Sequence, residues 1–166
     1  QSDPSCETET LIQQPGMKEE ERESFLQAFS EELSGERKGS LAAFCVMGGI
    51  FGEGIDLKKE QLIGAVIVGT GLPQISNERG ILMEYYEKRM GEGFDYAYRY
   101  PGMNKVLQAA GRVIRTIDDV GVIELLDERF LQSDYRNLFP KEWEKRLVCT
   151  VDSVESYLEK FWEEKQ

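Results

Sequence analysis

Two short, uninterrupted apolar runs constrain the fold of this chain more than any other feature. They are Leu41–Val46 and Ala65–Val68, and each leads into a glycine-rich segment. Continuous apolar runs of this length are typical of parallel strands that are covered on both faces. A third strand is predicted over Gly121–Leu126, and helices are predicted over 17–33, 78–90, 103–115 and 151–162. Helices that alternate with buried strands predict an α/β fold with an open, mostly parallel sheet flanked by helices.

The length of 166 residues predicts one domain with a hydrophobic core of its own. Residues 1–10 are polar and acidic, so we expect a flexible N-terminal end there and the domain over residues 11–166. No apolar run approaches the roughly 18 residues that a membrane span requires, so no membrane partner is expected.

The chain contains three cysteines and no histidine. Without histidine, neither a Ser/His/Asp triad nor a Cys/His pair can form, and a zinc site would lack both imidazole and a C-x-x-C pair. Cys45 lies inside an apolar run and is predicted to be a buried small hydrophobic residue. This cysteine usage fits a reducing compartment, so a cytoplasmic location is expected.

The formal net charge of −11 argues against a surface that attracts nucleic acid as a whole, because Lys and Arg dominate phosphate binding. A binding groove needs only a local basic stripe, however. Many of the acidic residues are concentrated in 18–36 and in the C-terminal tail. Nucleic-acid binding therefore stays open on composition alone.

The helix predicted over 103–115 has two contrasting faces. At about 100° per residue, one side gathers apolar residues that would face the core, namely Met103, Val106, Leu107, Ala110, Val113 and Ile114. The opposite side gathers Asn104, Gln108, Arg112 and Arg115. Two arginines on one stripe could bind a polyphosphate, because the planar guanidinium donates two parallel hydrogen bonds. The alternative is a pair of solvated surface arginines, with Arg115 complementing the negative end of the helix.

Two glycine-rich loops follow the apolar runs, where ligands bind in open α/β sheets. Gly48–Asp56 matches neither G-x-G-x-x-G nor G-x-x-x-x-G-K-[ST], so a dinucleotide fold or a self-sufficient P-loop is not expected. A structural turn and a functional loop both remain open there. For Gly69–Pro73, a plain turn from strand to helix is favoured.

Aromatic residues are interleaved with basic ones between 85 and 100. Such a pattern can stack nucleic-acid bases and follow a phosphate backbone, although aromatic rings more often serve as packing groups. The aromatic residues are Tyr85, Tyr86, Phe94, Tyr96, Tyr98 and Tyr100, and the basic ones are Lys88, Arg89 and Arg99.

Two segments carry a resemblance to a known family. Residues 49–57 resemble motif V of the XPD/DinG-type helicases of superfamily two, G-x-x-x-E-G-[IL]-D, and residues 108–115 resemble their motif VI, Q-x-x-G-R-x-[IL]-R. Asp118–Val122 and Leu126–Phe130 resemble the family's D-x-G strand and D-x-R-F segment, so the similarity runs from about 12 to 143. The resemblance implies a RecA-like fold and the second motor domain of an ATP-dependent DNA helicase that moves 5′ to 3′ on single-stranded DNA.

The resemblance also implies roles for individual residues. Arg115, as arginine finger, and Arg112 would meet the β- and γ-phosphates of ATP, and Gln108 would position the attacking water or the γ-phosphate oxygens. Four residues of motif V would bind nucleotide and link its state to DNA contact: Gly52, Glu53, Gly54 and Asp56. The resemblance implies single-stranded or forked DNA as the partner. Independently of it, the aromatic–basic pattern makes Tyr85, Arg89 and Arg99, together with Thr70 in the loop after the second apolar run, weaker candidates for contact with this DNA.

The motifs that hold ATP and Mg²⁺ in such helicases, a Walker A lysine and a D-E-A-H box, do not occur in the sequence. The resemblance places them, with any iron–sulfur cluster, in an N-terminal motor domain of the same protein. It also implies that the strand and helix which open the second domain are missing or shifted. We therefore expect this chain alone to be inactive. The alternative is a noncatalytic RecA-like module for protein interaction or regulation, which an acidic surface would suit.

Overall fold

The computed structural model describes residues 7–31, 39–51, 62–116 and 118–165. The chain divides into two compact units, residues 1–136 and 137–166, where the sequence predicts a single domain over 11–166. In the described part of the first unit, the strands form two parallel pairs, β1 with β2 and β3 with β4.

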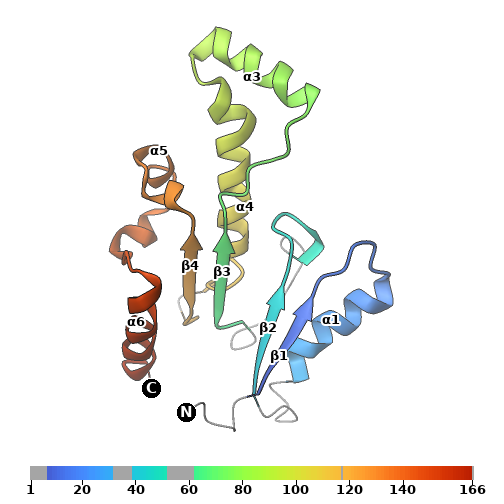
Figure 1. Cartoon of the computed structure of the whole chain (residues 1–166), viewed down its shortest axis with the longest axis vertical. Coiled ribbons are helices and arrows are strands. Elements are labelled where there is room, and N and C mark those ends of the chain that lie inside the picture. The colour runs from blue at the N-terminus through green and yellow to red at the C-terminus, as the bar shows by residue number, and fades with distance from the viewer. Residues whose placement is uncertain (1–6, 32–38, 52–61, 117, 166) are drawn as a thin grey trace. The chain divides into compact units, whose positions relative to one another are not determined.

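The first pair consists of β1 (Glu7–Ile12) and β2 (Gly39–Phe44), which lie side by side in Figure 1. Helix α1 (Glu19–Glu31) connects them in sequence and packs its apolar face on them through Phe25 and Phe29. Residues 7–10 belong to β1, whereas the sequence predicts a flexible end over 1–10. Residues 7–10 are all polar, so the sequence pattern does not indicate a strand there. The strand is held by its backbone pairing with β2.

The second pair consists of β3 (Gly64–Val68) and β4 (Val122–Leu126), with Ile67 opposite Leu125. Between these strands come α3 (Asn77–Met90), a π-helix (Asp95–Arg99) and α4 (Tyr100–Ala110). Helix α4 lies along β3, and α3 lies across the end of the column that the π-helix and α4 form (Figure 1). The predicted helix over 78–90 and strands over 65–68 and 121–126 are confirmed to within one residue.

The helix predicted over 103–115 has different ends in the structure. It begins at Tyr100, three residues before the predicted start, and includes Pro101, because a proline in the first turn needs no backbone hydrogen-bond partner. It ends at Ala110, and Gly111–Val113 form a turn. Arg112 and Arg115 therefore lie beyond the helix, and Ile114, predicted to face the core, is exposed.

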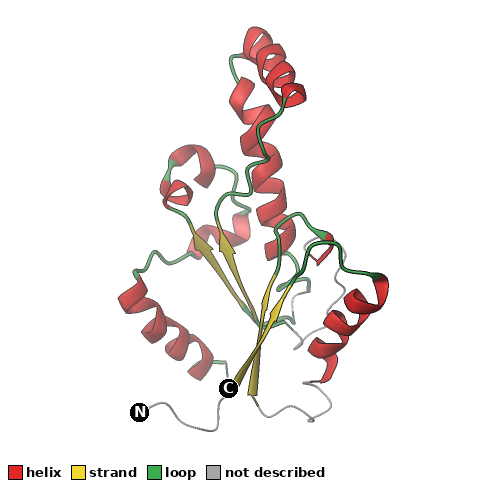
Figure 2. Ribbon diagram, turned by 45° about the vertical axis from the view of Figure 1, so that its right-hand side comes forward, coloured by secondary structure: helices red, strands yellow, loops and turns green. Residues whose placement is uncertain are grey.

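After β4, the first unit ends with a 3₁₀ turn (Glu128–Leu131) and α5 (Ser133–Arg136), which close over the buried rings of Phe130 and Tyr135. The second unit contains a 3₁₀ turn (Lys141–Lys145) and α6 (Val151–Glu163), drawn as helices in Figure 2. A capping box of Thr150 and Ser153 begins α6.

Cys45, which is predicted to be buried, is exposed. Strand β2 ends at Phe44, one residue before it, so the last part of the apolar run 41–46 belongs to the following loop. No helix within the described ranges combines the length and the apolar character needed to cross a lipid bilayer.

Candidate nucleotide-phosphate site

Helix α4 presents a buried face and an exposed face near its C-terminal end. Met103, Val106 and Ala110 are buried, as the helical periodicity predicts. Gln108 lies in the last turn on the exposed side. The amide oxygen and nitrogen of Gln108 are therefore open to a ligand, as its predicted role requires.

The turn after α4 (Gly111–Val113) carries Arg112, and Arg115 follows it by two residues. Its backbone is tightened by hydrogen bonds from Gly111 N to Leu107 O (2.9 Å), from Arg112 N to Ala109 O (3.1 Å) and from Val113 N to Ala110 O (3.1 Å). Val113 is buried, and Arg112 is half-buried. The apolar side chain thus anchors the turn, and Arg115, which follows it, is exposed.

Gly121 sets how closely this turn approaches the strands. A β-carbon on Gly121 would lie 2.5 Å from Val113 Cγ1 and 3.0 Å from Ile63 O, so only glycine fits there. Ile63 O also accepts a hydrogen bond from Val122 N (3.0 Å). The arginine-bearing turn therefore lies against the segment that enters β3, at the amino ends of β3 and β4.

Asp119 caps the backbone at Arg115. Its Oδ2 accepts hydrogen bonds from Arg115 N (2.8 Å) and Thr116 N (2.7 Å). These two bonds, the one from Arg115 first, lower the pKa of the Asp119 carboxyl below its ordinary value. The sequence offered Asp119 only as part of the D-x-G resemblance, and the structure assigns it the local task of holding the chain at Arg115.

The loop after β2 begins the segment that resembles motif V. A β-carbon on Gly48 would lie 2.9 Å from Lys105 Cδ, so this loop touches the middle of α4. Gln13, which follows β1, accepts a hydrogen bond from Val46 N through its Oε1 (2.9 Å) and thereby ties the two strand ends together. Gln13 is not among the site residues predicted from the sequence. The only indication of its role is that it directly follows an apolar pair of residues.

The four residues predicted to bind nucleotide from motif V, Gly52, Glu53, Gly54 and Asp56, lie outside the described residues. Phe51, the last described residue before them, and Leu62, the first described residue after them, belong to one hydrophobic cluster. Ile63, which comes next, lies at Gly121 and Val113. Ile63, six residues after the motif V segment, and Val113 of the motif VI turn therefore both lie against Gly121.

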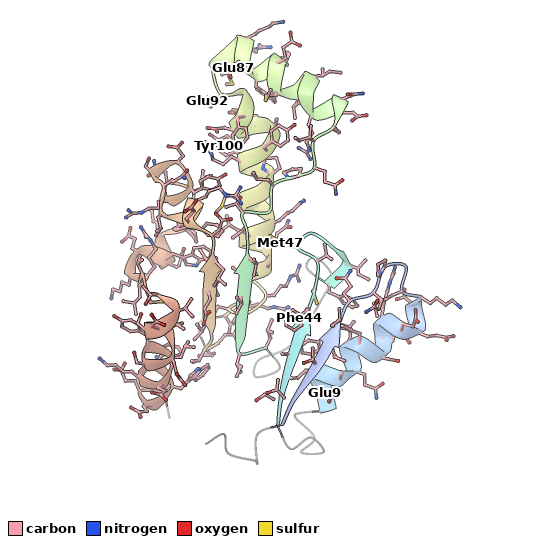
Figure 3. All side chains as sticks on the ribbon, in the orientation of Figure 1. Glu9, Phe44, Met47, Glu87, Glu92 and Tyr100 are labelled. Atoms are coloured by element: carbon pink, nitrogen blue, oxygen red, sulfur yellow. The ribbon has the colours of Figure 1, made fainter. Side chains whose placement is uncertain are left out.

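The loop after β3 is enclosed rather than open. The side chain of Thr70 is 1% exposed, and no group in the described part of the chain hydrogen-bonds its Oγ1. Gly71 lies against Gly102 of α4, and a β-carbon on Gly71 would also lie 3.0 Å from the sulfur of Met47, which Figure 3 labels in the loop after β2. Thr70 therefore presents no surface to DNA in this conformation.

The other three residues predicted to contact DNA fall into two groups. Tyr85 and Arg89 are exposed on α3, where the Arg89 guanidinium lies over the Tyr85 ring and donates a hydrogen bond to its hydroxyl. Arg99 is instead enclosed, ion-paired with Asp95 (2.6 Å) and Asp134 (3.2 Å). Among these three residues, only Tyr85 and Arg89 form an exposed aromatic–basic pair. Arg99 does not belong to the predicted DNA surface.

Comparison with known protein families assigns this chain to one of them. Residues 1–146 match the family described as "Helicase C-terminal domain". The chain belongs to this family. It is 28% identical over 155 residues to "Regulator of telomere elongation helicase 1 homolog" of Caenorhabditis elegans. The matched region covers 88% of this chain and 15% of that protein. It is 31% identical over 105 residues to "ATP-dependent DNA helicase XPD" of Sulfolobus acidocaldarius, which covers 61% of this chain and 18% of that protein.

A solved XPD helicase structure is similar to this helicase C-terminal domain, with a TM-score of 0.59 and 23% sequence identity over 77% of this chain and 22% of that one. This likeness shows the fold, and the α/β, RecA-like class predicted from the sequence is confirmed. The chain spans only about 15% of the length of the Caenorhabditis relative.

The helicase C-terminal domain offers donors for phosphate. Guanidinium and amide groups on Arg112, Arg115 and Gln108 suit the oxygens of a polyphosphate. In the described ranges, no three His, Cys, Asp or Glu side chains gather closely enough to hold a metal ion.

Proposed function

We propose that this chain is the second motor domain of an ATP-dependent DNA helicase and supplies arginines to an ATP site that it shares with an N-terminal motor domain. The observation that carries the proposal is the turn after α4. This turn contains Arg112 and the buried Val113, and Arg115 follows two residues later, where its backbone N–H donates a hydrogen bond to Asp119. Membership of the helicase C-terminal domain family supports it.

In this proposal, Arg115 acts as the arginine finger. Its guanidinium stabilises the charge that builds on the transferring γ-phosphoryl group, and Arg112 binds the β- and γ-phosphate oxygens. Gln108, one turn before, orients the attacking water or the γ-phosphate. ATP and Mg²⁺ would be held mainly by the N-terminal motor domain, together with any iron–sulfur cluster of the whole protein.

In this proposal, motif V links the nucleotide state of this site to DNA contact. Gly48, the residue before this motif, touches Lys105 of α4, and Ile63, six residues after the motif, lies against Gly121 at the arginine-bearing turn. A closure of the two motor domains on ATP would therefore act on α4 and on this loop together. Single-stranded or forked DNA is the proposed partner, along which the helicase moves 5′ to 3′. The proposed location is cytoplasmic, with nucleoid association if the source is bacterial.

Replacement of Arg115 by alanine tests the proposal. The variant keeps the backbone hydrogen bond to Asp119, so the fold should persist. In a polypeptide that carries this chain and its P-loop motor domain, we expect DNA-stimulated ATP hydrolysis to fall by about 10³-fold or more. Arg136→Ala, an exposed arginine on α5, serves as the matched control and should leave turnover unchanged.

Normal turnover in the Arg115→Ala variant would remove Arg115 from the finger role. A wild-type polypeptide that hydrolyses no ATP with DNA present would favour the noncatalytic interaction or regulatory module. The formal net charge of −11 is the observation on that side.

A further inference from the structure

Arg99 stands at the centre of a cluster that joins two segments far apart in the sequence. Its Nη1 lies 2.6 Å from Asp95 Oδ1, one turn earlier in the π-helix, and its Nη2 lies 3.2 Å from Asp134 Oδ2, in α5. The first contact is local and the second crosses from the helix before β4 to the helix after it. One guanidinium therefore connects both sides of the β4 segment.

Two aromatic rings complete the cluster. The guanidinium carbon of Arg99 lies 5.6 Å from the ring centroid of Phe94 and 5.3 Å from that of Tyr135, both within the range of a cation–π contact. The Arg99 side chain is 17% exposed, and its Nε has no hydrogen-bond partner in the described part of the chain. The Arg99 guanidinium is therefore largely enclosed, while its partner Asp134 is 56% exposed.

The position of Arg99 in the chain places this cluster directly before α4. Arg99 is the last residue of the π-helix, and α4 begins at the next residue, Tyr100, whose amide donates to Asp95 O across the π turn. A π turn inserts one extra residue and so rotates everything that follows it relative to an α-helix. Whatever holds this turn also sets the rotation of α4.

The rotation of α4 decides which residues face the ligand. Its C-terminal end, about 16 Å away at 1.5 Å per residue, carries Gln108 on the exposed side and leads into the turn of Arg112 and Arg115. Because an α-helix transmits a rotation along its length, a change at Arg99 reaches Gln108 directly, and it reaches Arg112 and Arg115 through the turn that continues from the end of the helix.

We propose that Arg99 is a positioning residue, whose clamp between Phe94, Tyr135 and the carboxylates of Asp95 and Asp134 sets the rotation of α4 and thereby the placement of Gln108, Arg112 and Arg115. The inference rests on the proposed function for what those residues do, but not for where they lie. It also explains why Arg99 does not belong to a DNA-contacting surface.

Amide hydrogen exchange of the whole chain tests the placement directly. Arg99→Met keeps much of the apolar stem and removes the cation. We expect exchange to rise by about tenfold, the effect of losing a charged hydrogen bond on local opening, across residues 103–113 as well as at the clamp. Lys88→Met, which removes an exposed ion pair with Glu84 on α3, is the control and should alter α3 only.

Arg99→Lys separates charge from geometry. Lysine can still reach a carboxylate, but its ammonium has no planar face to lie between two rings, so exchange over 103–113 should stay raised. The proposal is overturned if lysine restores wild-type exchange. It is equally overturned if Arg99→Met changes only residues 94–100 and 133–136, or if it speeds exchange evenly through α1 as well, which would indicate general destabilisation.

A kinetic measurement on the two-motor polypeptide joins the placement to the proposed function. Displaced arginines act less well on the transition state, so Arg99→Met should lower kcat for ATP by about tenfold to a hundredfold with a smaller change in KM. If kcat is unchanged while exchange over 103–113 rises, the Arg99 clamp holds α4 but does not place Gln108, Arg112 and Arg115 for the reaction, and the proposal is overturned. If the wild type hydrolyses no ATP, the proposed function fails, and the exchange data alone decide the placement.

Discussion

Gly71, in the loop after β3, lies directly against Gly102, in the first turn of α4. A β-carbon on Gly71 would lie 2.7 Å from Gly102 O, and one on Gly102 would lie 2.5 Å from Thr70 O. Gly71 also has a φ of 66°, which favours glycine. The two glycines let backbone meet backbone, and this close approach sets the distance between α4 and the carboxyl end of β3.

Substitution of Gly102 by alanine should therefore destabilise the domain. The added methyl group must displace backbone atoms on both sides, at a cost of about 1–3 kcal/mol in the free energy of unfolding. Urea denaturation measures the change. Gly80→Ala is the matched control, because nothing lies within 4 Å of its β-carbon position inside α3, and it should stabilise by about 0.5–1 kcal/mol. Equal effects of the two substitutions would contradict the close approach.

The hydrogen bonds of Asp119 predict a pH-dependent turn at Arg115. Because the folded-state pKa of Asp119 lies below its ordinary value of 3.8, the ionised carboxylate stabilises the turn above that pH. The contribution is lost as the pH falls through the lower, folded-state pKa. NMR titration of the Arg115 and Thr116 amides should show a midpoint below 3.8, and Asp119→Asn should abolish this titration. A midpoint at or above the ordinary value would be inconsistent with the capping role.

The cluster between α1 and the first strand pair should be sensitive to the loss of Phe25. This side chain is 6% exposed, and its ring stacks on that of Phe51 with centroids 4.3 Å apart. Phe25→Ala should cost about 3–5 kcal/mol of unfolding free energy, through lost burial and the cavity left behind. Ile75→Ala, at a side chain that is 91% exposed, should change stability by less than about 0.5 kcal/mol. A small effect at Phe25 would mean that the cluster does not form in solution.

The exposed pair on α3 predicts weak binding of single-stranded DNA by this chain. Tyr85 is 50% exposed, and Arg89 lies over its ring with its guanidinium carbon 5.6 Å from the centroid. Replacing both by alanine should weaken binding of a labelled oligonucleotide about tenfold or more in fluorescence anisotropy at low salt, from lost stacking and phosphate contact. Tyr157→Ala, at an exposed tyrosine of α6, is the control. If wild type and double variant bind alike, α3 is not the DNA surface.

Most helices and strands could be predicted because their signals are local. The runs 65–68 and 121–126 and the periodic stretches 78–90 and 151–162 agree with β3, β4, α3 and α6 to within one residue. Strand β1 could not be predicted, because four of its six residues are polar and it is held by pairing with β2. The C-terminal end of α4 was missed for a related reason. Periodicity continues to Arg115, but the chain turns where Val113 packs against Gly121.

The candidate site divides in the same way. The order of Gln108, Arg112 and Arg115 along the chain is a sequence property, and it was sufficient to identify the resemblance to the motif, while the ligand of these residues stays a prediction. Their placement depends on contacts between distant segments, such as Gly102 on Gly71 and Gly121 on Val113. Arg99 and Thr70 show the limit most clearly. The residue types of both suited DNA, but their surroundings enclose them, and burial depends on which segments pack together in three dimensions.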